Sequence, residues 1–155
     1  MKRIILLIFS FILFACDGES TGENTSMHFD VPLNHPNGLI VNRPTGFEES
    51  STSDGFRFAV SGASRMRNPP SISVKRQDTA PDVQRLTSKR LGGDRAFYRI
   101  SISAAGSGGT EYDFWAIKPS GNHWIVVQAW EQHELVSPSF RLAWMLLEQA
   151  QLQHE

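Results

Sequence analysis

The side chain with the clearest chemistry is the thiol of Cys16, the only cysteine among 155 residues. A single thiol cannot form a disulfide within its own chain, so in an oxidising compartment it would remain reactive unless it is modified. Lys2 and Arg3 precede the apolar run 4–15. A charged start, a short apolar middle and a small last residue are typical of an export signal. The run is shorter than the roughly 20 residues of a membrane-spanning helix, so the sequence predicts export of the chain and modification of Cys16.

Residues 13–16 (Leu-Phe-Ala-Cys) resemble the lipobox of bacterial lipoproteins, in which the cysteine is acylated and becomes the first residue of the mature protein. The alternative is a plain secretory signal that happens to end near a cysteine. Acyl chains of the palmitate type hold a protein firmly, because each buried methylene contributes about 0.8 kcal/mol. Asp17 follows the cysteine and resembles the inner-membrane retention signal of enterobacterial lipoproteins. We therefore expect a periplasmic protein anchored to a membrane, more specifically the inner membrane.

The sequence divides into three parts. Residues 1–15 are the expected signal peptide, residues 16–34 the lipidated cysteine with a flexible tether, and residues 35–155 one globular α/β domain. Residues 17–27 are polar and acidic, and such a stretch buries too little apolar surface to offset its ordering entropy. The remaining length is enough for a single core without disulfides.

Basic residues concentrate in the middle of the chain. Residues 57–99 carry ten Lys and Arg against three Asp, and the segments on either side are acidic. The pattern fits a solvated basic face on a sheet, and equally a surface that meets anionic headgroups, cell-wall polymer or an acidic protein. Because the chain is expected to be exported, we exclude nucleic acid as a partner.

Strand patterns dominate the hydrophobic periodicity. Residues 98–102, 111–118 and 123–130 alternate or run apolar, and short glycine-containing turns at 106–109 and 119–122 join them. This spacing predicts an antiparallel meander of three strands. Further short strands are predicted at 38–42, 56–60 and 71–75, whereas 79–89 fits either a short helix or a loop.

A helix is predicted after Ser137, whose hydroxyl would cap it, with Pro138 at the first helical position. Its apolar residues form one stripe, namely Phe140, Ala143, Trp144, Leu147 and Ala150. The stripe should pack across the sheet, which gives an α+β fold: an antiparallel sheet with a C-terminal helix on it.

All four tryptophans lie between 115 and 144, and we expect most of them in the core. Along 123–130, alternation puts Trp124, Val126, Gln128 and Trp130 on one face and Ile125, Val127 and Ala129 on the other, and one of these faces must meet the helix. The face that ends in Trp130 could instead be a contact surface.

Motifs for catalysis are incomplete. Residues 62–66 lack the last glycine of a serine-hydrolase elbow. Glu131 and His133 would share one strand face, but a metal site needs three or four convergent ligands. Asp113 lies on a predicted strand without a partner carboxylate, and we interpret it as a solvated surface acid. The sequence thus predicts no enzyme, no cofactor, no metal and no small-molecule substrate.

Segments 38–47 (GLIVNRPTGF) and 121–130 (GNHWIVVQAW), followed by a helix with Phe140 and Trp144, resemble the periplasmic immunity lipoproteins of bacterial type VI secretion systems. The resemblance covers about residues 35–150. It implies a PsbP-like α/β sandwich that binds a cognate effector toxin and inhibits it sterically, without a reaction of its own. It also implies that the toxin degrades peptidoglycan.

Two predicted loops are our candidates for contact with that toxin. The first is 45–55, with Glu48, Glu49 and Asp54, and the second is 104–110, with Ser107 and Thr110. Both could equally be mobile connections. The alternative function is an envelope accessory lipoprotein that binds cell-wall polymer or a membrane complex, which the basic stretch favours. A small hydrolase is the third possibility.

Overall fold

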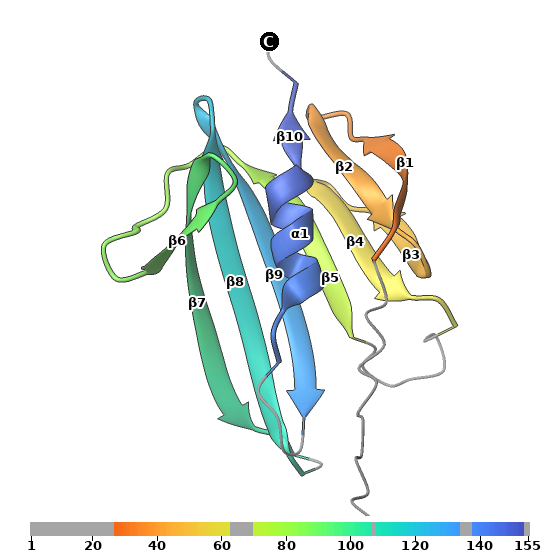
Figure 1. Ribbon diagram of the computed structural model, residues 1–155, viewed down its shortest axis with the longest axis vertical. Helices are drawn as coiled ribbons and strands as arrows, with labels where there is room; N and C mark the ends of the chain where they lie inside the picture. The colour runs from red at the N-terminus through yellow and green to blue at the C-terminus, as the bar shows by residue number, and fades with distance from the viewer. Residues whose placement is uncertain (1–26, 63–69, 107, 134–137, 154–155) are drawn as a thin grey trace, which may run out of the picture.

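The computed structural model describes residues 27–62, 70–106, 108–133 and 138–153. These residues form two layers: a seven-stranded antiparallel sheet, and a helix with a three-stranded sheet on one of its faces (Figure 1). The elements are β1 (Phe29–Asn34), β2 (Leu39–Pro44), β3 (Phe47–Ser51), β4 (Gly55–Val60), β5 (Ser71–Gln77), β6 (Thr87–Leu91), β7 (Asp94–Ala104), β8 (Thr110–Ser120), β9 (His123–His133), α1 (Arg141–Gln149) and β10 (Gln151–Leu152). The large sheet has the order β3-β4-β5-β9-β8-β7-β6, and the small sheet the order β1-β2-β10. The predicted α+β class is confirmed.

The meander predicted from the alternating pattern is confirmed as β7, β8 and β9. Each of these strands is 11 residues long, and neighbouring strands pair antiparallel along almost their whole length. The turn between β8 and β9 has only two residues, Gly121 and Asn122, between the paired Ser120 and His123. Gly121 has φ 61°, the left-handed conformation that a type II′ hairpin requires at its first turn residue.

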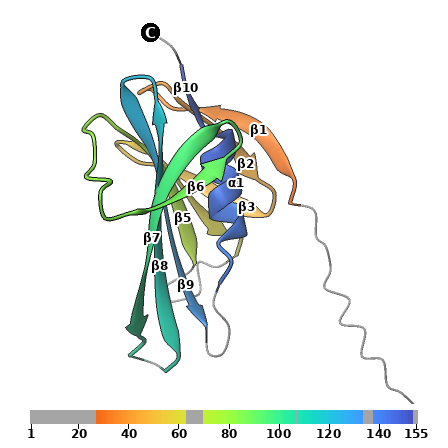
Figure 2. The ribbon, with the colours of Figure 1, turned by 60° about the vertical axis from the view of Figure 1, so that its left-hand side comes forward.

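The core lies between the large sheet and the second layer, which consists of α1 and the small sheet (Figure 2). From β9 it receives Ile125, Val127 and Ala129, one of the two faces that the alternation predicts. From α1 it receives Leu142, Ala143, Leu146 and Leu147, and from β2 Leu39 and Val41. Burying each large apolar side chain contributes about 1.5–3 kcal/mol, so this cluster holds the two layers together.

The helix begins at Arg141, not directly after Pro138 as the sequence predicts. Phe140 precedes it with φ 50° and ψ 30°, and among the described residues no side chain caps the first turn. The ring of Phe140 stacks on Phe114 of β8 at 4.8 Å between centroids, and Phe140 is only 3% exposed. A residue in the left-handed conformation cannot belong to a right-handed helix, so the helix starts after it. Ser137, the predicted cap, lies outside the described residues.

The folded part begins before residue 35, which corrects the predicted end of the tether at residue 34. Residues 29–34 form β1, which pairs antiparallel with β2. The register shifts between Phe29 and Pro32, because proline cannot donate to the ladder. Residues 79–86 contain no helix, and β6 follows them as the edge strand beside β7.

One cation ties the two sheets together. Arg76 of β5 donates hydrogen bonds to the carbonyl oxygen of Asn37, which precedes β2, and to the carboxylate of Asp78. Its guanidinium also donates to the ring of His123 at 3.0 Å, and the Nδ1 of that ring lies 3.0 Å from the same carboxylate. None of the helices in the described ranges is long and apolar enough to span a membrane.

Candidate functional site

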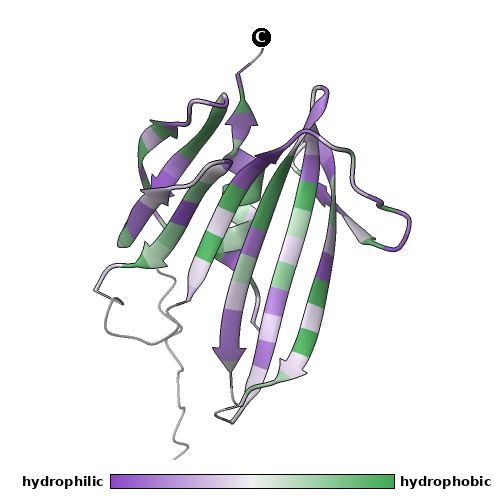
Figure 3. Ribbon diagram, turned by 180° about the vertical axis from the view of Figure 1, so that it is seen from behind, coloured by the Kyte–Doolittle hydropathy of each residue, from purple (hydrophilic) through white to green (hydrophobic). Residues whose placement is uncertain are grey.

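One face of the large sheet points away from α1, and we call it the open face. Seen from behind, no described helix or strand lies across it (Figure 3). A depression of about 570 Å³ occupies its middle. The depression is lined by Thr52, Arg57, Ser71, Ser73, Lys75, Arg99, Ser101, Asp113, Phe114, Trp115, Gln128, Ala129 and Trp130. We call this surface the open-face depression.

The strand register assembles the open-face depression from two rows of side chains. The first row crosses β4, β5, β9, β8 and β7 as Arg57, Ser73, Gln128, Trp115 and Arg99. The second crosses β5, β9, β8 and β7 as Ser71, Trp130, Asp113 and Ser101. Residues opposite one another on one face of an antiparallel pair have Cβ atoms about 5 Å apart, so each row is a continuous band of contacts.

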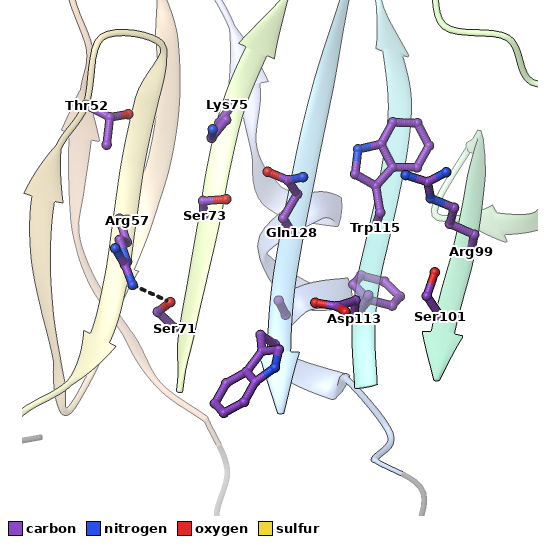
Figure 4. A pocket seen from close by; sticks show the side chains of 13 residues that line it. Thr52, Arg57, Ser71, Ser73, Lys75, Arg99, Ser101, Asp113, Trp115 and Gln128 are labelled. Atoms are coloured by element: carbon purple, nitrogen blue, oxygen red, sulfur yellow. Dashed lines mark hydrogen bonds between the residues drawn. The ribbon is translucent and has the colours of Figure 1, made fainter. Parts of the chain in front are cut away.

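Both arginines of the first row have neutral partners (Figure 4). Arg57 donates a hydrogen bond to the hydroxyl of Ser71 at 3.0 Å. The guanidinium of Arg99 lies 5.4 Å from the centre of the Trp115 ring, a cation–π contact. Among the described residues, neither arginine forms an ion pair with a carboxylate. Their charges therefore remain available to an anionic partner.

Asp113 is the one carboxylate that lines the open-face depression. It is exposed, as the interpretation of a solvated acid predicts, and it pairs across the sheet with Trp130 and Ser101. Within the described ranges it makes no hydrogen bond or ion pair. The depression thus offers a single carboxylate beside its two unpaired guanidinium groups.

A further ion pair lies at the rim, between Lys75 of β5 and Asp54 at 3.4 Å. Burial alone would raise the pKa of Asp54, but the hydrogen bond from Thr52 and the charge of Lys75 outweigh it, so the pKa is lowered. Asp54 therefore stays ionised and neutralises Lys75. This pairing leaves Arg57 and Arg99 as the cations of the depression without a carboxylate.

Two of the predicted contact residues, Glu48 and Glu49, lie on strand β3, so the predicted loop 45–55 is wrong as a continuous loop. Glu49 forms an ion pair with Arg43 at 3.2 Å, and Glu48 accepts a hydrogen bond from the backbone of Gly62 at 3.4 Å. Both acids line a separate hollow of about 540 Å³ beside β1 and β2. The structure does not bring them to the open-face depression, whereas Asp54 stands at its rim.

Thr110 is the first residue of β8 and pairs with Ala104 and His133, far along the sheet from β3. Ser107 and Cys16 lie outside the described residues. The contact role of Glu48, Glu49, Asp54, Ser107 and Thr110 and the lipidation of Cys16 stay predictions.

The tryptophans differ from the prediction that most of them lie in the core. Trp115, Trp124 and Trp130 are half-buried on the open-face side of β8 and β9. Trp144 alone packs with the core cluster, edge-on to Tyr98 and Phe114. The alternation along β9 did place Trp130 with Gln128, which is the sequence signal that could have found this site.

The arrangement is suited to binding. Guanidinium groups bind carboxylates with two parallel hydrogen bonds, and indole rings bury large areas at low entropic cost. Within the described ranges, no three His, Cys, Asp or Glu side chains gather closely enough to hold a metal ion. The open-face depression is therefore best described as a polar and aromatic recognition surface.

Comparison with known proteins identifies the family of this chain. Residues 40–151 match the family described as "Type six secretion immunity 3 domain". The chain is also 47% identical over 153 residues to "Immune protein Tsi3" of Pseudomonas aeruginosa, covering 99% of this chain and 100% of that protein. A crystal structure from Bacteroides thetaiotaomicron superposes with a TM-score of 0.64 at 10% identity, over 83% of this chain and 50% of that one, which supports the fold alone. The chain belongs to the type six secretion immunity 3 family, the immunity proteins of type VI secretion.

Proposed function

We propose that this chain protects the cell that makes it by binding a type VI effector in the periplasm and blocking it sterically. The observation that carries this proposal is the family match over residues 40–151, which includes every strand of the large sheet. An immunity protein implies a cognate effector as its protein partner. Inhibition by occlusion needs a rigid, complementary surface and no reactive group.

The effector is proposed to degrade peptidoglycan. The export signal at residues 1–15 supports this, because an exported inhibitor meets its target outside the cytosol, where the cell-wall polymer lies. Lipidation at Cys16, with retention at the inner membrane through Asp17, would keep the inhibitor beside that polymer. The PsbP-like form of the sandwich stays a prediction of the sequence resemblance.

The test is protection of a susceptible bacterium that produces, in its periplasm, the protein encoded beside this chain. Co-expression of the full chain should restore growth and preserve the cell wall, and purified effector and chain should form a complex. A chain without residues 1–15 is the matched control, because it folds in the cytosol and should give no protection. Lysis that continues despite a full-length, exported chain, together with no complex, would refute the function.

Anchoring is tested separately on the mature protein. Mass spectrometry of its first peptide should give an acylated Cys16, and Cys16→Ser should move the protein from the membrane to the soluble periplasmic fraction. An unmodified thiol on an intact N-terminus would refute the anchor. Protection by the Cys16→Ser chain would then indicate whether anchoring matters for immunity.

A further inference from the structure

We propose that the open-face depression is the surface that binds the effector, and that it meets an acidic surface of that protein. This inference rests on the proposed function and adds to it where the partner binds and which chemistry it presents. It replaces the acids of β3 as the leading contact site, because Glu49 already pairs with Arg43 within the chain.

Two arginines of the open-face depression are available to an acidic partner. Arg57 and Arg99 stand at opposite ends of one in-register row, and neither has a carboxylate partner among the described residues. The row crosses four strand spacings, which place the two positions about 19 Å apart along the sheet. A partner that offers carboxylates with about this separation would satisfy both guanidinium groups through bidentate hydrogen bonds.

The centre of the open-face depression is aromatic and polar. Trp115 and Gln128 lie between the two arginines, and Trp130 and Asp113 lie in the neighbouring row. Tryptophan and arginine are the residue types enriched at the energetic centres of protein interfaces. Asp113 has no hydrogen-bond or ion-pair partner within the described ranges, so we expect the partner protein to place a hydrogen-bond donor opposite it. The expected partner is therefore acidic at its edges, with an apolar centre that carries a hydrogen-bond donor or a basic group.

The sheet beneath the two rows is preorganised for binding. On β7, beside Arg99 and Ser101, the alternate side chains Ile100 and Ile102 are exposed. All other residues of the two rows stand on strands whose alternate side chains are buried beneath, such as Phe114 on β8 and Val127 on β9. Backbone and register are thus fixed before binding, so little entropy is lost when the partner docks. A rigid sheet face of this kind favours tight binding more than mobile loops do.

The experiment measures affinity between the purified chain and the effector encoded beside it. Arg57→Glu combined with Arg99→Glu should weaken binding by about 100-fold or more, because both arginines would then repel the acidic surface. The control combines Arg85→Glu with Arg141→Glu, an equal change in charge at two exposed residues that do not line the open-face depression. Arg141 opens α1, where an acid is favourable, so the control should fold and bind as the wild type does.

A second variant and a second measurement guard against misfolding. Ser73→Glu places an acid directly opposite Arg57 in the first row, where it would pair with that arginine, and it should weaken binding by about 10-fold while the unfolding temperature stays unchanged. The association rate of the wild-type chain should fall as salt is added, because salt screens the attraction. That of the double variant should not fall, because salt then screens a repulsion.

The results distinguish a wrong binding surface from a wrong function. Tight binding by the wild type and by both row variants would overturn this surface and leave the proposed function intact. No binding by the wild type would overturn both. Soluble peptidoglycan fragments serve as the second probe. Fragments that bind the wild type but not the double variant, while effector affinity stays equal, would assign the surface to glycan and overturn the inference.

Discussion

The ammonium of Lys118 on β8 donates a hydrogen bond to the carbonyl oxygen of Glu148, in the last turn of α1, at 2.8 Å. The last carbonyl groups of a helix lack partners within the helix and carry partial negative charge. Lys118 satisfies one of them from the sheet, although it is only 7% exposed. A buried cation thus links the two layers at the end of α1.

Replacement of Lys118 by Met should lower the free energy of unfolding at neutral pH by about 1–3 kcal/mol, because the carbonyl of Glu148 loses its donor.

Burial lowers the pKa of Lys118, and the nearby charges of Asp94 and Glu148 raise this pKa only in part. The folded chain therefore releases this proton at lower pH than the unfolded chain. Between the two pKa values the unfolded state binds more protons, so the wild type should gain stability as pH rises. Urea unfolding of both proteins between about pH 8 and about pH 10 measures the difference. Parallel curves would contradict the assignment.

Gly55→Ala should destabilise the large sheet strongly. A Cβ on Gly55 would lie 2.1 Å from the carbonyl oxygen of Val74 and 2.9 Å from the Cα of Lys75, so β4 and β5 would have to separate. We expect a loss of about 3 kcal/mol or more in urea unfolding. Gly93→Ala is the matched control, because nothing lies within 4 Å of its Cβ position, and it should stay within about 0.5 kcal/mol.

Phe140 combines a strained backbone with a buried ring, and two substitutions separate these effects. Phe140→Ala should cost about 3–5 kcal/mol, because the stacking on Phe114 and the packing of the ring are lost. Phe140→Gly loses the same ring but relieves the positive φ, which costs an L-residue about 1–2 kcal/mol. Thermal unfolding should therefore rank Gly as equal to or more stable than Ala at this position. A markedly less stable Gly variant would argue against the left-handed conformation.

The contacts of Asp78 predict an acid-sensitive part of the stability. The hydrogen bond from Arg76 lowers the pKa of Asp78. Burial opposes this effect, and the charges of Arg76 and His123 lower the pKa further. A carboxylate with a depressed pKa in the folded state stabilises above its ordinary pKa, and this contribution is lost as pH falls through the folded value. Asp78→Asn should therefore be less stable than the wild type near neutral pH. The two denaturation midpoints should converge below about pH 3.

Local patterns were sufficient to predict the meander and the division of β9 into two faces, because alternation and short glycine turns act between neighbouring residues. The small sheet could not be predicted in the same way. Its pairing joins Gln151 of β10 to Ile40 of β2, more than a hundred residues earlier. The start of α1 was wrong because a capping pattern at residues 137–138 gives no information on the stacking of Phe140 against β8.

The site was predicted only in part, for a related reason. The sequence placed Trp130 and Gln128 on one face of a strand, but both faces of β9 carry large apolar residues. Which face α1 covers depends on tertiary packing, so the tryptophans were expected in the core. Likewise, the basic residues of 57–99 were visible as a segment, whereas the row that joins Arg57 to Arg99 exists only through the register of five strands.

Strict alternation along β9 has a consequence for how such a protein could change over time. Even-numbered positions such as Gln128 and Trp130 point outward, while odd-numbered ones such as Val127 build the interior. Substitutions at exposed outward positions could change which effector the protein binds without disturbing the buried core. A single inserted residue would exchange the two sets along the rest of the strand, so diversification is expected through replacements and not through insertions.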